Sequence, residues 1–303
     1  MTLIDIPKRG RPALAEPARA QVDIRLSGPL LVQVEGRAQQ RKLTGPVRRL
    51  FCYLVSYPGR VHRREALREE LWEDANRLSA SAFSTVLWRL RKIIDTWPGL
   101  SVDACAETVV CHLGPEVSVD RHQLSAALAG SEDFALEHAC AQWSAPFLEG
   151  DTAAWILTER NRAEADWLAA LFHLMRAAGE REDYATALAY GRRILEADPF
   201  RESVHAEVMW LLVLTGQRAH AITRHLAFRG LLKRELGIAP MADTNALFEH
   251  IRDGLDATAQ VATRPNEAPP RRACQQSLSQ FIAATEAARG ELYRSLCAAH
   301  LSA

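Results

Sequence analysis

The sequence predicts a mainly helical protein in which a small α+β module precedes a domain of tetratricopeptide-like helical repeats. Two observations predict this fold class. β-prone runs flank three amphipathic helical patterns in the first 115 residues, and matched small residues recur 34 positions apart in the middle of the chain. The expected parts are a flexible arm at 1–20, the α+β module at 21–115, the helical domain at 116–255, a linker at 256–273 and a C-terminal amphipathic helix at 274–303.

The composition favours a folded cytoplasmic protein. The 303 residues are 48% hydrophobic, which is enough to bury a sizeable core. Six scattered cysteines form no C-x-x-C pair and indicate reduced thiols, and the N-terminus has no signal-peptide core. No apolar run approaches the roughly 20 residues that span a bilayer.

Charge is distributed unevenly behind a formal net charge of zero. Residues 1–100 hold 18 Lys and Arg against 10 Asp and Glu, whereas residues 101–255 hold 14 against 23. A basic module joined to an acidic one suggests that only the first attracts a polyanion. A solvated basic surface explains the surplus of +8 equally well.

The first module begins with a hairpin and a helix. The hairpin turns at Gly28-Pro29, and its alternating apolar residues are Val22, Ile24, Leu26, Leu30, Val32 and Val34. Thr44 can cap a helix that ends at the turn 57–59. The apolar face of this helix is Val47, Leu50, Phe51, Leu54 and Val55.

Two further helices and a second hairpin follow. The pattern predicts a helix over 63–72, a helix over 79–95 capped by Ser79, and a hairpin within 100–114. The expected buried stripe of the 63–72 helix is Ala66, Leu67 and Leu71. The order of sheet, three helices and hairpin is that of a winged helix-turn-helix with an N-terminal sheet.

The 79–95 helix has two contrasting faces. Its core stripe is Phe83, Leu87, Leu90 and Ile94, and hydroxyl side chains, Trp88 and cations lie opposite. Small hydroxyl residues let a backbone approach DNA closely, and cations reach phosphates. The candidate DNA-binding residues of the module are Arg48, Arg49, Arg63, Arg64, Ser81, Ser84, Thr85, Trp88, Arg89, Arg91 and Lys92.

Each candidate has a simpler explanation. The cations of the 79–95 helix fit a solvated helix face, and Trp88 fits packing on the wing as well as contact with a sugar or a thymine methyl. The paired arginines that begin the first two helices fit solvation or phosphate contact, which a helix N-terminus favours.

The middle of the chain carries an internal repeat. Tyr184, Ala185 and Ala187 are followed 34 residues later by Arg218, Ala219 and Ala221, and 34 residues is the tetratricopeptide period. An ordinary helical bundle is the alternative. Helical arrays of this kind suit peptides or partner helices, so this domain is expected to mediate self-association.

The C-terminal region has an apolar spacing typical of an amphipathic helix. Its apolar residues are Leu278, Phe281, Ile282, Leu292, Tyr293 and Leu296. Docking on the same chain, on a second subunit or on an exposed edge is compatible with this pattern.

Sequence motifs of enzymes are not found. The chain has no phosphate-binding loop, dinucleotide fingerprint, zincin motif or nucleophile elbow. Its ten histidines are not placed at metal-ligand spacings. We therefore expect no enzyme activity, no cofactor and no metal.

Several stretches resemble one protein family. "GPVRRLFCYLVSYPGRVHRREALREELWED" and "STVLWRLRKII" are similar to the DNA-binding domain of the SARP-type bacterial transcriptional activators. "FLEGD", "ILEADPFRESVHAEVMWLLVLTGQRAHAI" and "LKRELGIAP" are similar to the bacterial transcriptional activator domain of those proteins. The resemblance covers roughly 230 residues, from the first helix of the module to about Gly254.

The resemblance implies an OmpR-type winged helix that binds tandem direct repeats in promoters, fused to a tetratricopeptide-like domain. It also implies activation through RNA polymerase and its sigma factor, and we expect a homodimer on nucleoid DNA. The implied recognition helix is 79–94, with phosphate contacts at Arg49, Arg89, Arg91 and Lys92. The loop linked to polymerase contact contains Glu73, Asp74, Asn76 and Arg77.

The sequence departs from the family pattern at three places. Val47 replaces a lysine, Ser81 and Ser84 replace larger amides, and Ala106-Glu107-Thr108 replaces a glycine-rich wing tip. An acidic wing tip is repelled by phosphate, which leaves the wing contact and the cognate site open. The alternative function is an adaptor that binds proteins through both modules and does not bind DNA.

Overall fold

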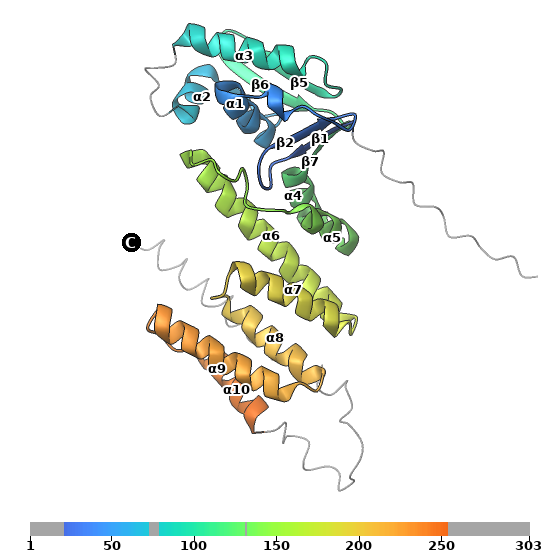
Figure 1. Ribbon diagram of the computed structural model, residues 1–303, viewed down its shortest axis with the longest axis vertical. Coiled ribbons are helices and arrows are strands. Elements are labelled where there is room, and N and C mark those ends of the chain that lie inside the picture. Colours follow the sequence, from blue (N-terminus) through green and yellow to red (C-terminus); the bar gives the residue numbers. More distant parts are fainter. Residues whose placement is uncertain (1–20, 73–78, 131, 254–303) are drawn as a thin grey trace, which may run out of the picture. The chain divides into compact units, whose positions relative to one another are not determined.

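The computed structural model describes residues 21–72, 79–130 and 132–253. The chain divides into two compact units, Met1–Ala177 and Ala178–Ala303, and the division falls within the 27-residue helix α6 (Ala154–Glu180) (Figure 1). The predicted arm, linker, C-terminal helix and polymerase-contact loop lie outside the described residues. The unit boundary differs from the predicted module boundary at 115/116, because elements after residue 116 complete the first core.

The first unit contains two small sheets. Strands β1 (Val22–Arg25) and β2 (Leu31–Val34) form the predicted hairpin, and β3 (Arg37–Ala38) extends it. Strand β7 (Val117–Val119) adds to the other edge in parallel with β1, in the register Val22 to Val117. The sheet order is therefore β3-β2-β1-β7.

The second sheet forms the wing. Strands β5 (Leu100–Ala104) and β6 (Thr108–Leu113) pair in antiparallel register, and β4 (His62–Arg63) pairs with β6. The predicted second hairpin is thus present, with a turn at residues 105–107. Because β4 directly precedes helix α2, the wing is hydrogen-bonded to the start of the helix-turn-helix.

The helices of the first unit follow the expected order. They are α1 (Gly45–Ser56), α2 (Arg64–Leu71), α3 (Ala80–Ile94), α4 (Asp120–Gly130) and α5 (Asp133–Gln142), with a 3-10 turn at Gln40–Lys42. Leu67 and Leu71 of α2 are buried as predicted, but Ala66 is exposed. The prediction for Ala66 was wrong because one short helix turned toward α1 buries only a narrow stripe.

A single core joins the winged-helix elements to the segment after residue 146. Phe147, Leu148, Trp155 and Ile156 are buried in the same cluster as Leu50 and Leu90. The Trp155 ring lies edge-on to Tyr53 of α1, at 5.1 Å between centroids, and to Phe147, at 6.3 Å. The start of the predicted second module is therefore part of the first hydrophobic core.

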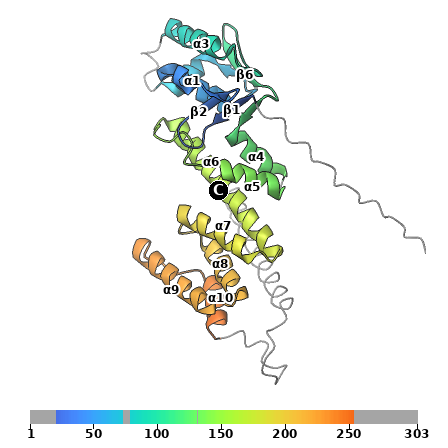
Figure 2. The ribbon, with the colours of Figure 1, turned by 45° about the vertical axis from the view of Figure 1, so that its right-hand side comes forward.

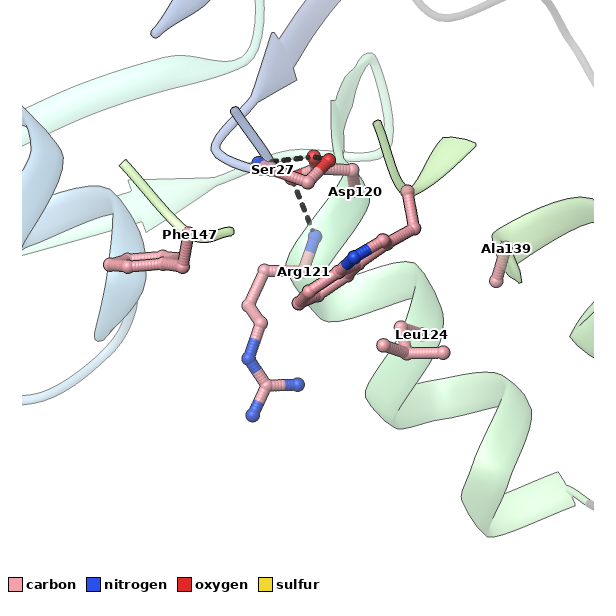
Figure 3. A pocket seen from close by; sticks show the side chains of 7 residues that line it. Ser27, Asp120, Arg121, Leu124, Ala139 and Phe147 are labelled. Atoms are coloured by element: carbon pink, nitrogen blue, oxygen red, sulfur yellow. Dashed lines mark hydrogen bonds between the residues drawn. The ribbon is translucent and has the colours of Figure 1, made fainter. Parts of the chain in front are cut away.

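Asp120, the first residue of α4, holds the residues that follow β1 against the start of α4 (Figure 3). Its buried carboxylate accepts hydrogen bonds from the backbone N–H groups of Leu26, at 2.9 Å, and Ser27, at 2.8 Å, and from the Ser27 hydroxyl. Buried polar groups need such partners, so this carboxylate fixes the end of β1 against α4. No local sequence pattern marks Asp120 for this position.

The second unit consists of antiparallel helices. They are α7 (Tyr184–Ala197), α8 (Glu202–Leu214), α9 (Arg218–Glu235) and α10 (Ala242–Arg252) (Figure 2). Helices α7 and α9 begin at the two residues that the 34-residue spacing matched, and Ala187 and Ala221 are fully buried. The repeat prediction is therefore confirmed at the level of helix register.

Candidate nucleic-acid interface

Helix α3 begins and packs as its sequence predicts. The Ser79 hydroxyl accepts a hydrogen bond from the N–H of Ala82, at 3.1 Å, and satisfies one of the free donors of the first turn. The predicted core stripe Phe83, Leu87, Leu90 and Ile94 is buried, together with Val86. In Figures 1 and 2 the helix lies at the edge of the first unit, with α1 and the wing strands on its inner side.

The opposite face of α3 is exposed. It presents Ser81, Ser84, Thr85, Trp88, Arg89, Arg91 and Lys92. Trp88 is 60% exposed, which excludes its packing as a core residue of the first unit. The Lys92 ammonium lies 5.1 Å from the centre of the Trp88 ring, so a cation–π contact holds both side chains together on the surface.

Two hydroxyl side chains of this face are hydrogen-bonded to the backbone of α3. Ser84 donates to the Ala80 carbonyl at 2.9 Å, and Thr85 donates to the Ser81 carbonyl at 3.0 Å. These bonds hold both side chains against the helix backbone and leave the lone pairs of their hydroxyl oxygens facing solvent. The first half of the α3 face is therefore flat, polar and accessible.

Arg63 and Arg64 lie where the wing meets the helix-turn-helix. Arg63 is exposed and pairs with Thr108 of β6, and the N–H of Arg64 donates to the carbonyl of Glu107 at 2.8 Å. The Arg64 guanidinium extends toward the Ser84 hydroxyl of α3, at 3.5 Å. The structure thus brings Arg64 and the α3 face together and places Arg63 at the wing.

The wing turn contains a thiol that the sequence analysis did not consider. Cys105 is exposed, and its sulfur receives hydrogen bonds from the hydroxyl of Thr108, at 3.0 Å, and from its N–H, at 3.3 Å. These bonds lower the pKa of the Cys105 thiol. The only sequence signal was the position of a cysteine at a hairpin tip.

Arg48 and Arg49 contact other parts of the first unit. Arg48 forms an ion pair with Asp151 at 2.7 Å, and Arg49 donates to the carbonyl of Leu71 at 2.8 Å. Both line a groove of about 950 Å³ between α1, the end of α2 and residues 148–156. The Asp151 carboxylate therefore compensates the charge of Arg48. No sequence pattern indicated this partner, because it lies 103 residues away.

The "FLEGD" segment is held by one arginine. The Arg160 guanidinium of α6 donates to the carbonyls of Phe147, Leu148 and Asp151, each at 2.9 Å. Nearby, the Tyr57 hydroxyl of α1 donates to the Glu159 carboxylate at 2.9 Å. Burial and this carboxylate raise the pKa of Tyr57. The segment is therefore a rigid support for α1.

Among the described residues, no group of three or more His, Cys, Asp or Glu side chains is arranged to hold a metal ion. Within the same ranges no helix combines the length and apolarity that crossing a membrane requires.

Comparison with known proteins assigns the second half of the chain. Residues 116–252 match the family model of the bacterial transcriptional activator domain. Among curated proteins, none is similar enough in sequence to count as a relative. The fold is similar to that of Mycobacterium tuberculosis EmbR, solved in complex with a low-affinity phosphopeptide, with a TM-score of 0.64 and 18% identity over 88% of this chain and 71% of EmbR. The chain thus combines a winged helix-turn-helix fold with a region that matches the bacterial transcriptional activator domain.

Proposed function

We propose that this protein is a transcriptional regulator of the SARP type and that it binds promoter DNA by inserting α3 into the major groove. The observation that carries the proposal is the exposed α3 face, where hydroxyl residues at the N-terminal end are followed by Trp88 and three cations. A recognition helix reads base edges with its N-terminal residues, and cations fix it on phosphates. Helix α3 has both the hydroxyl residues and the cations on its exposed face, and its opposite face is buried in the core.

The residues of the face have different roles in this proposal. Ser81, Ser84 and Thr85 contact base edges. The hydroxyls of Ser84 and Thr85 donate to the helix backbone, so their oxygens can accept hydrogen bonds from the amino groups of cytosine or adenine. Arg89, Arg91 and Lys92 contact phosphates, and Trp88 packs on a sugar or a thymine methyl. Arg63 and Arg64 contact the backbone beside the wing, and Arg49 supplies a further phosphate contact.

The finer regulatory features of the proposal are taken from the resemblance to the SARP-type activators. We propose that the protein acts in the cytoplasm at the nucleoid as an activator, binds tandem direct repeats, and pairs subunits through its helical domain. Glu73, Asp74, Asn76 and Arg77, which connect α2 to α3, are the proposed contacts to RNA polymerase and its sigma factor. The bacterial transcriptional activator domain supports this activator role.

The test begins with selection of bound fragments from genomic DNA by the full chain, followed by footprinting. The affinity of the full chain for the selected site is then measured over a series of salt concentrations. Lys92→Ala should weaken binding to every duplex and flatten the plot of log K against log salt by about 0.9. Thr85→Ala should instead reduce the preference for the selected site and leave the slope unchanged.

Lys233→Ala is the matched control, because Lys233 is an exposed lysine of α9 in the second unit. It should change neither affinity nor slope. The proposal fails if the full chain prefers no fragment over random duplex, or if Lys92→Ala and Lys233→Ala behave alike. Failure of both measurements would favour the adaptor function.

A further inference from the structure

The second unit carries an exposed apolar surface at one end. It consists of the α9–α10 connection, with Leu236, Ile238 and Met241 exposed by 52, 54 and 66%, and of Phe200 in the α7–α8 connection, exposed by 40%. Most large apolar residues in the described part of this unit are buried, so four exposed ones within two connections are unusual. We call these four residues the end surface.

The two connections are adjacent. The backbone N–H of Met241 donates to the Glu202 carboxylate at 2.7 Å, and Glu202 lies two residues after Phe200. Both connections lie at the same end of the antiparallel helices, on the left of Figure 1. Pro240, between Ile238 and Met241, is buried and fixes the path of the longer connection.

We propose that the C-terminal segment 274–296 of the same chain docks on the end surface. Its apolar residues recur at helical spacing, among them Leu278, Phe281 and Ile282. Such a stripe needs an apolar partner, and the end surface supplies one. The proposal concerns a contact within one chain and is independent of DNA binding.

The length of the connecting chain fits this contact. Helix α10 has 11 residues, so its start lies about 17 Å from its end at Arg252. Residues 253–277 separate Arg252 from Leu278. For 25 residues, the random-coil relation gives an end-to-end distance of roughly 25–30 Å. The segment can therefore fold back along α10, at an effective concentration on the order of millimolar.

The cysteines of the chain allow a direct test in the full-length protein. Cys274 begins the C-terminal segment, Cys297 directly follows it, and Cys105 is the exposed cysteine of the described residues. In a Cys105→Ser background, Ile238→Cys introduces a thiol on the end surface. Copper–phenanthroline oxidation should then form a disulfide between position 238 and Cys274 or Cys297 within a monomer, identified by non-reducing peptide mapping.

Leu226→Cys is the matched control, since Leu226 is 43% exposed on α9 and lies outside the end surface. Disulfide formation should be at least tenfold faster at position 238 than at 226, and Phe281→Glu should remove that difference. Disulfides that join two chains would overturn the proposal in favour of a second copy as the occupant. Equal rates at the two positions would overturn docking altogether.

Discussion

Replacing Asp120 by alanine tests whether one carboxylate joins the winged helix to the activator domain. The substitution removes the acceptor of four buried donors, which are the N–H groups of Leu26, Ser27 and Arg121 and the Ser27 hydroxyl. Each unsatisfied buried donor costs about 1–3 kcal/mol. The adjoining cavity of about 10 Å³ has roughly the volume of one water, which can partly replace the carboxylate.

The expected destabilisation is therefore about 3–5 kcal/mol, a large part of the about 5–15 kcal/mol that holds a domain together. Urea unfolding followed by tryptophan fluorescence should show a midpoint about 1–2 M lower for the transition of the first unit. Asp120→Asn keeps the size and one acceptor oxygen, and it should give a smaller shift.

Asp103→Ala is the control for this experiment. Asp103 forms an ion pair with His112 at 3.3 Å, but its side chain is 77% exposed. An exposed pair contributes about 0–1 kcal/mol, so the midpoint should barely move. If Asp120→Ala shifts the midpoint no more than Asp103→Ala, the carboxylate does not join the two parts.

Three further predictions concern folding, pH and thiol chemistry. A fragment of residues 1–115 lacks β7 and the buried residues after 146, so circular dichroism should find it unfolded, whereas residues 1–180 should fold; equal helicity per residue would contradict the shared core. Burial lowers the pKa of His205 and His225, so on acidification the two imidazoles bind protons in the unfolded chain before they do in the folded one. The urea midpoint of the second unit should therefore fall as the pH drops below about 6.5. His225→Leu should weaken that dependence, and an unchanged pH profile would refute the assignment. Burial raises the pKa of Cys52 and Cys111 to about 12, so a thiol reagent should label Cys105 in the native protein and label these two cysteines only after unfolding; native labelling of either would contradict their burial.

Local patterns predicted helix α3 and the repeated helices well. The two faces of α3 follow from residue spacing alone, because a 3.6-residue period fixes which side chains share a face. The 34-residue spacing predicted the starts of α7 and α9, because successive repeats of paired helices begin at that interval. Each of these features depends on residues within one helix or one helical pair.

Features that depend on distant residues could not be predicted in this way. Strand β7 has three residues and pairs with β1, about 95 positions earlier, so no local signal marks it. The burial of Asp120 and the partner of Arg48 depend on the same long-range packing. The exposure of Ala66 could not be predicted either, because periodicity does not give the width of a buried stripe.

The three carbonyl hydrogen bonds of Arg160 also matter for genetics. This side chain holds a segment that supports α1 through Asp151 and Trp155, although none of these residues belongs to the proposed DNA-reading face. A random screen for inactive alleles should therefore return changes at Arg160 as readily as changes on α3. Variants at Arg160 should recover activity at low growth temperature, because their defect is one of stability. Variants that lose a DNA-contacting side chain of α3 should stay inactive at every temperature.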